Sequence, residues 1–307
     1  MSSVSKPRVR HNRHKQGLNL TLEKLSADFR KKTRVITMRI VLLVILYTCL
    51  SCSGHSSKNQ DVRQQLLDSS NVAAHITKSE STDIPLFAQK IIKSYPLFDI
   101  HYDNNKLVFA DGTKIVYDDG RNKEFKQMLD ESDIEDMFSM PYGVEDSIPG
   151  YLNDCGRSRN EELFKKMYGN SEAAVRKNLV TINWFGQKLL FSKVNNAAEQ
   201  LEKVASELTS YKQYKKYLTN ASSFYWRKVR GANRQSAHSY GIAIDINTSF
   251  SNYWLWSNPR SSETDKIKYE NKIPIEIVRI FEKHGFIWGG RWYHYDTMHF
   301  EYRPELL

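Results

Sequence analysis

The sequence predicts an α+β fold in which mixed helices surround a small antiparallel sheet that carries the functional site. Two stretches, 241–247 and 298–302, alternate apolar and polar side chains as half-buried strands do. Asp111-Gly112 separates two apolar runs, which is a strong signal for a β-hairpin. Amphipathic helices are expected at 86–92 and 196–218. Predicted strands and helices therefore alternate along the chain, as they do in a mixed α+β domain.

Local signals place the remaining elements. Ser171 is of the residue type that caps helix N-termini, and Pro274 and Gly285 bracket another helical stretch. The remaining predicted segments are helices at 133–140, 161–168, 171–179 and 273–284, strands at 180–184, 188–191 and 223–229, and a loop at 141–160.

The positive charge of the chain is concentrated at its N-terminus. Residues 1–39 carry 11 Lys and Arg against two acidic residues, so that +9 of the net charge of +10 lies there. The remaining residues, 40–307, are nearly neutral, which argues against a nucleic-acid-binding domain. The 6 Trp, 17 Tyr and 14 Phe indicate a well-buried core and not a disordered chain.

Residues 1–52 are interpreted as an N-terminal extension followed by a signal peptide. The apolar run that begins at Ile40 has about a dozen residues, too few for a transmembrane span. Met38 lies directly before it and is a candidate for the true translation start. Leu50-Ser51-Cys52 resembles the cleavage box of bacterial lipoproteins, although Cys49 replaces the usual Leu or Val. We therefore expect export to the periplasm or cell surface and a lipid tether at Cys52, with an ordinary signal peptide as the alternative.

The stretch from Ser236 to Asp245 reads S-A-H-S-Y-G-I-A-I-D and contains two residues of metal-ligand type. On a strand, Asp245 shares a face with the small residue Ala243, which leaves room for a bound group. Gly241 permits a turn that brings the imidazole of His238 toward this carboxylate. An inert His–Asp pair fits the same pattern, but the two side chains also supply half of a zinc site.

The other half of the site is expected near the C-terminus. From Met298 onward the alternation places His299 and Glu301 on the polar face of a final strand. His299 is therefore a candidate third ligand, and three protein ligands leave the fourth position of a tetrahedral zinc ion to water. Asp296, three positions earlier, would take a proton from that water and return it to the leaving amine. The predicted chemistry is metal-assisted amide hydrolysis.

The pattern S-x-H-x-x-G-x-A-x-D, followed by D-x-x-H and F-E, resembles the zinc D,D-peptidases of the VanY and D-alanyl-D-alanine carboxypeptidase type. Relatives in that family include L-alanyl-D-glutamate endolysins. The resemblance implies a D,D-peptidase-like (Hedgehog-like) fold and one Zn²⁺ per chain, held by His238, Asp245 and His299. It implies that Asp296 is the catalytic base.

The family also has an arginine upstream of the first motif that binds substrate or the transition state. Arg227 is our choice for this role, with Arg230 and Arg234 as alternatives. Substrate-binding or supporting roles are expected for Ser236, Glu301 and Trp292. His294 is expected to be structural or substrate-facing and not a ligand.

The chain after the signal peptide is expected to have three parts. Residues 53–82 have the polar composition of a tether, 83–179 form the N-terminal part of the catalytic domain, and 180–307 form the zinc peptidase core. Cys155 is expected to be a buried structural cysteine. Because removal of the signal peptide leaves at most Cys52 and Cys155, the fold cannot rest on a disulfide framework.

The expected function is trimming of peptidoglycan stem peptides by a D-alanyl-D-alanine carboxypeptidase. An endopeptidase that cuts the L-Ala–D-Glu bond or a cross-link is a close alternative. A non-catalytic, metal-stabilised wall-binding protein is an alternative of a different class, and the presence of Asp296 argues against it. The expected partners are stem peptides and, through the lipid, the membrane, but no nucleic acid.

Overall fold

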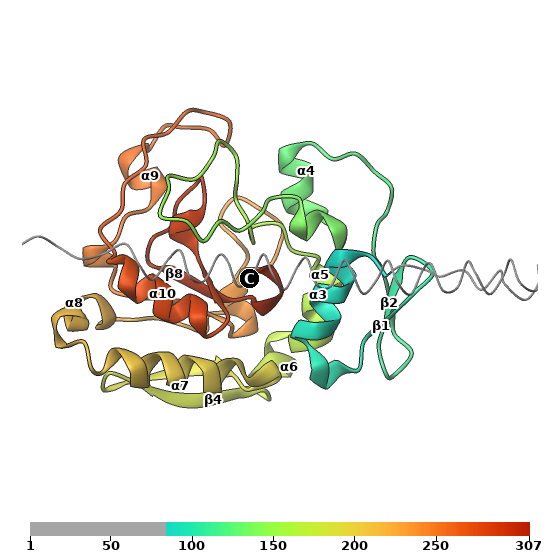
Figure 1. The fold of residues 1–307 in the computed structure, drawn as a ribbon, viewed down its shortest axis with the longest axis horizontal. Coiled ribbons are helices and arrows are strands. Elements are labelled where there is room, and N and C mark those ends of the chain that lie inside the picture. Colours follow the sequence, from blue (N-terminus) through green and yellow to red (C-terminus); the bar gives the residue numbers. More distant parts are fainter. Residues whose placement is uncertain (1–83) are drawn as a thin grey trace, which may run out of the picture. The chain divides into compact units, whose positions relative to one another are not determined.

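The computed structural model describes residues 84–307 (Figure 1). The predicted signal peptide, the lipidation site at Cys52 and the tether at 53–82 lie outside the described residues, and so remain predictions. Within the described range, no helix is both long enough and apolar enough to cross a membrane.

A three-stranded antiparallel sheet carries both motifs. Its strands are β6 (Ala243–Asp245), β8 (His299–Tyr302) and β7 (Phe286–Trp288), in the order β6-β8-β7. The register places Asp245 directly opposite His299. This pairing fixes the two polar side chains side by side on one face of the sheet. Strands β6 and β8 were predicted, whereas β7 was not.

The opposite face of this sheet packs into the core. Ile242, Ile244 and Ile246 are fully buried, as the predicted alternation requires. Helix α10 (Ile275–Lys283) covers this face, and the ring of Phe281 stacks on that of Phe300 with centroids 3.8 Å apart. The helix follows Pro274 and precedes Gly285, whose φ of 88° only glycine adopts readily.

A hairpin and a long helix form the next layer. The hairpin consists of β4 (Leu179–Trp184) and β5 (Gln187–Ser192), and helix α7 (Ala197–Leu208) packs on it and on α10 (Figure 1). The expected helix at 196–218 is too long. Helix α7 ends at Leu208, Tyr211 is non-helical (φ −104°, ψ 69°), and a 3₁₀-helix at Lys212–Tyr214 leads into the short helix α8 (Lys215–Leu218).

The expected strand at 223–229 is wrong. In place of sheet pairing, its backbone bonds to the loop that carries the first motif: Tyr225 N donates to His238 O at 3.3 Å. Ser236 N likewise donates to Arg227 O at 3.1 Å. The segment forms only one isolated antiparallel bridge, between Lys228 and Gln235, and so no strand forms.

The N-terminal half of the described chain forms a second small sheet with flanking helices. The predicted hairpin is confirmed, because β2 and β3 pair antiparallel around Asp111-Gly112. The additional strand β1, the helix α4 and a 3₁₀-helix in place of the helix at 133–140 were not predicted. The elements are α3 (Leu86–Ser94), β1 (His101–Asp103), β2 (Lys106–Val108), β3 (Lys114–Val116), α4 (Phe125–Asp130), the 3₁₀-helix Glu135–Phe138, α5 (Glu161–Tyr168) and α6 (Glu172–Arg176).

The two halves share one core. A continuous cluster of buried residues extends from Ala88 in α3 to Leu306 near the C-terminus. Tyr95, fully buried after α3, donates from its hydroxyl to Glu305 at 2.5 Å. The α+β class is therefore confirmed, and the boundary between 83–179 and 180–307 remains a prediction.

Candidate active site

A tight turn brings His238 to the end of strand β6. Residues Ala237–Tyr240 form a 3₁₀-helix that ends at Gly241, which has a φ of 68°. A Cβ at Gly241 would lie 2.4 Å from Leu179 Cδ2 and 3.3 Å from Ser192 N, so a larger residue would require the Leu179 side chain to move. Glycine is therefore required by both the turn and the packing.

Three predicted ligand atoms meet at one point. His238 Nε2 and His299 Nδ1 lie 3.2 Å apart, and they lie 3.2 and 3.0 Å from Asp245 Oδ1. Donor atoms held at about 2.0–2.1 Å around a tetrahedral ion are about 3.3 Å apart. The three atoms thus already have the spacing of one face of a zinc coordination tetrahedron.

The outer nitrogens of both imidazoles are also engaged. His238 Nδ1 lies 2.7 Å from the carbonyl oxygen of Ser223 and donates to it, which leaves Nε2 as a free lone pair. His299 Nε2 lies 3.4 Å from Glu301 Oε2, so that Nδ1 faces the shared point. Partners of this kind orient metal-binding imidazoles.

The charges around the three converging atoms favour a bound cation. Burial opposes the ionisation of Asp245, but the adjacent imidazoles hold the pKa of its carboxyl well below the usual range. Burial likewise disfavours a charged His299, yet hydrogen bonds to Asp245 and Glu301 raise its pKa to about 10. A positive charge is thus stabilised there, whether a proton or a metal ion supplies it.

Asp296 lies beside these residues without joining them. Its Oδ1 is buried and has no hydrogen-bond partner among the described residues. Burial, together with the charge of Asp245, raises the pKa of Asp296 to about 7. Gly289 allows this arrangement, because a Cβ there would lie 2.5 Å from the Asp296 carbonyl oxygen. A carboxyl group with a pKa near neutrality is suited to accept and return a proton.

Comparison with known proteins bears on this same stretch. Residues 230–302, which include all four of these side chains, match the sequence model of a family described as D-alanyl-D-alanine carboxypeptidase. This segment is similar to the D-alanyl-D-alanine carboxypeptidase family. The match confirms the resemblance inferred from the two motifs and supports a metallopeptidase. No curated protein and no solved structure matches the chain.

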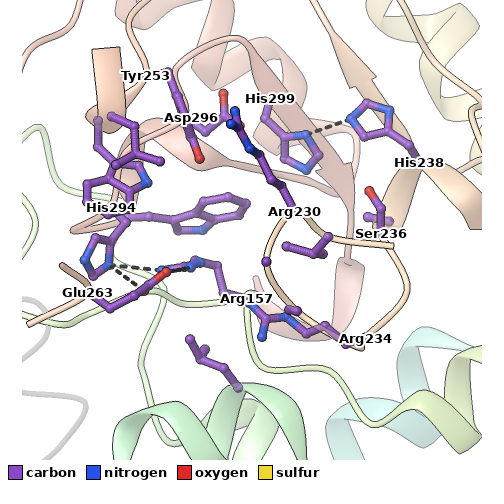
Figure 2. Close-up of a pocket in the computed structure, with 18 of the residues that line it drawn as sticks. Arg157, Arg230, Arg234, Ser236, His238, Tyr253, Glu263, His294, Asp296 and His299 are labelled. Atoms are coloured by element: carbon purple, nitrogen blue, oxygen red, sulfur yellow. Dashed lines mark hydrogen bonds and ion pairs between the residues drawn. The ribbon is translucent and has the colours of Figure 1, made fainter. Parts of the chain in front are cut away.

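A cleft of about 960 Å³ leads to this site. Asp245 lines it, as do His238, Asp296 and His299 (Figure 2). Its other wall comes from outside the matched segment and includes α4 and Arg157. This volume lies near the upper end of the range of about 300–1,000 Å³ that is typical of ligand-binding clefts.

The arginine candidates differ in their surroundings. Arg234 is buried and forms an ion pair with Asp130, so its charge is already neutralised. Arg227 and Arg230 are exposed, line the cleft and form no ion pair within the described range. The charge of Arg227 lowers the pKa of Asp296, and Figure 2 shows Arg230 directed toward the same residue. Both therefore remain candidates.

Ser236, Trp292 and Glu301, the remaining predicted residues, all lie near the site. The hydroxyl of Ser236 lines the cleft and makes no hydrogen bond within residues 84–307. The Trp292 ring lies 5.5 Å from that of His299, centroid to centroid. Glu301 is fully buried and pairs with Arg303 at 3.0 Å, besides contacting His299.

Other acidic clusters in the described chain already hold a cation of their own. Lys123 Nζ lies 3.0 Å from Asp133 and 2.9 Å from Asp119. Arg157 fills the group formed by Asp154, Glu263 and His294. Neither cluster offers room for a metal, whereas the group around Asp245 contains no lysine or arginine.

His294 and Cys155 are both structural in their immediate contacts. His294 is buried, and its Nδ1 lies 2.6 Å from Asp154 Oδ2. Cys155 is a buried free cysteine, and burial raises the pKa of its thiol to about 12. The cleft residues Arg157, Glu263 and Tyr253 were missed, since only their position in the folded chain relates them to the motifs.

Proposed function

We propose that this protein is a zinc-dependent peptidase that hydrolyses peptidoglycan stem peptides as a D-alanyl-D-alanine carboxypeptidase. The observation that carries the proposal is the meeting of His238, Asp245 and His299 within 3.2 Å, next to a carboxyl oxygen of Asp296 that has no partner among the described residues. Two neutral nitrogens and one carboxylate oxygen are a donor set typical of catalytic zinc.

The residues of the chain have distinct tasks in this reaction. His238, Asp245 and His299 would hold zinc, which would polarise the scissile carbonyl and acidify the attacking water. Asp296 accepts the proton of that water and delivers it to the leaving nitrogen. Burial holds the pKa of Asp296 near neutrality, and its Oδ1 is free of competing hydrogen bonds from residues 84–307.

Two other groups complete the arrangement. Arg227 is proposed to stabilise the oxyanion or to hold the terminal carboxylate, because it has no ion-pair partner in the described range and is close enough to influence Asp296. Glu301 orients His299 through Nε2. Burial raises the pKa of Glu301, but the nearby Arg159, His299 and Arg303 lower it by more, so that the carboxylate stays ionised.

The proposed location is outside the cytoplasm. It rests on the basic and apolar residues before Ser53 and on the lipoprotein-like box at Cys52. A stem-peptide substrate is found in that compartment, so the two proposals are consistent. Mass spectrometry of the native N-terminus tests it; a chain that retains residues before Met38 would contradict both the start and the cleavage.

Incubation with purified muropeptides tests the activity. Loss of one terminal alanine supports the carboxypeptidase, and cleavage within the peptide supports the endopeptidase. A zinc-loaded protein that binds but cleaves nothing would favour the wall-binding class. An ordinary structural metal site would not require Asp296 at its edge, which is why we favour an enzyme.

A further inference from the structure

A second charged cluster lies in the same cleft, away from the proposed zinc ligands (Figure 2). Arg157 is at its centre. Its Nη1 donates to Asp154 Oδ2 at 2.5 Å, and its Nη1 and Nη2 donate to Glu263 Oε2 and Oε1 at 3.0 and 2.9 Å. Arg157 and Glu263 line the cleft, and neither has a task in the proposed reaction.

The inner half of the cluster holds the guanidinium in place. The Asp154 side chain is fully buried and accepts a hydrogen bond from the backbone N–H of His294 at 2.9 Å. Its other oxygen is shared by His294 Nδ1 and Arg157. Asp154 therefore neutralises Arg157 and fixes the orientation of its guanidinium, whose Nη1 and Nη2 face Glu263.

Glu263 differs from Asp154 in its burial and in the segment that carries it. Its side chain is 43% exposed, and it belongs to residues 258–272, which form no helix or strand. Two carboxylates face the Arg157 guanidinium; the His294 imidazole lies 2.6 Å from Asp154 but 3.7 Å from Glu263, so Glu263 is the more loosely held of the two. The exposed carboxylate of Glu263 therefore borders solvent in the cleft, where a carboxylate of a ligand can compete for the same guanidinium.

We propose that Arg157 is a subsite for a carboxylate of the substrate peptide, and that Glu263 occupies it until substrate binds. The bidentate contact that Glu263 makes is the geometry with which arginine recognises carboxylates. The identity of the peptide rests on the proposed function: a stem peptide retains a free carboxylate on its γ-linked D-glutamate. The cleft is large enough to contain this residue together with the terminal dipeptide.

The test compares two synthetic peptides that differ only in that carboxylate. They are L-Ala-γ-D-Glu-L-Lys-D-Ala-D-Ala and its counterpart in which the D-glutamate carboxylate is amidated. Calorimetric titration of the zinc-loaded Asp296→Asn protein measures binding without turnover. In this background, Glu263→Gln should tighten binding of the carboxylate peptide about three- to tenfold and leave the amidated peptide unchanged.

Two further variants make the result specific. Glu172→Gln breaks a similar ion pair with Arg176 on α6, outside the cleft, and should change neither affinity. Arg157→Lys, checked for folding by thermal melting, should remove the preference for the carboxylate peptide, since a lysine loses the bidentate contact.

Several results would overturn the subsite. Equal effects of Glu263→Gln on both peptides, or weaker binding of the carboxylate peptide, would show that the pair only anchors residues 258–272. Failure of both peptides to bind would also reject it. If the wild-type protein binds with the expected preference but cleaves neither peptide, the proposed function fails and the subsite stands. If it cleaves both peptides without preference, the subsite fails and the proposed function stands.

Discussion

Replacement of Asp296 by Asn separates catalysis from metal binding. The substitution removes the proton acceptor but keeps the shape of the side chain and both backbone contacts, Asp296 N to Gly289 O and His299 N to Asp296 O. The Asp296 side chain makes no hydrogen bond in the described range, so none is lost. General acid–base catalysis contributes about 10²–10⁴-fold, and kcat/KM should fall by that factor.

The expected loss corresponds to about 3–5 kcal/mol of transition-state stabilisation. Zinc content should remain one per chain, because Asp296 is not among the three converging atoms. Rates on a D-Ala-D-Ala-terminated peptide and zinc by mass spectrometry give both quantities. Normal turnover by Asp296→Asn would refute the base assignment, and loss of zinc would show that Asp296 is a ligand.

The remaining predictions concern stability, pH and the metal. The pKa of Asp296 is about 7 in the folded protein and 3.8 in the unfolded chain, so the folded state binds the carboxyl proton more tightly. The metal-free protein therefore loses stability as the pH rises from about 4 to about 7. The Asp296→Asn variant should avoid this loss. Its free energy of unfolding, measured by denaturant titration with a chelator present, should rise relative to wild type by on the order of 1–3 kcal/mol between about pH 4 and pH 8. Since the base must be ionised, kcat/KM should rise with pH along an acid limb at or below about pH 7, and a flat profile would contradict this. Glu301→Gln should weaken zinc affinity about 10–100-fold, measured by competition with a chromogenic chelator, because His299 loses the carboxylate that orients it. Chelation should abolish peptide hydrolysis and lower the melting temperature, and added zinc should restore both; activity that survives complete removal of zinc would count against a metallopeptidase.

The sequence was most informative where regular alternation coincides with chemically specialised residues. His299 and Asp245 could be paired from the sequence because both lie on polar faces of short strands, and the register then places them opposite each other. Gly241 was equally informative, since its position before a strand implied the turn that returns His238. These are local properties, and local properties can be predicted from the chain.

Long-range pairing could not be predicted. The segment 223–229 has strand composition, but it forms only an isolated bridge, between Lys228 and Gln235, which only the folded chain reveals. Arg157 and Glu263 are separated by 106 positions and carry no periodic signal. Helix α7 ends at Leu208 although the apolar spacing continues to Tyr211, so the spacing alone did not locate its end.

The central claim is that a zinc ion bound by His238, Asp245 and His299 serves peptide hydrolysis. The most direct measurement combines zinc stoichiometry with mass analysis of muropeptides incubated with the purified protein. We predict one zinc per chain and the loss of one terminal alanine from pentapeptide stems. A fully zinc-loaded protein that leaves every muropeptide intact would contradict the claim.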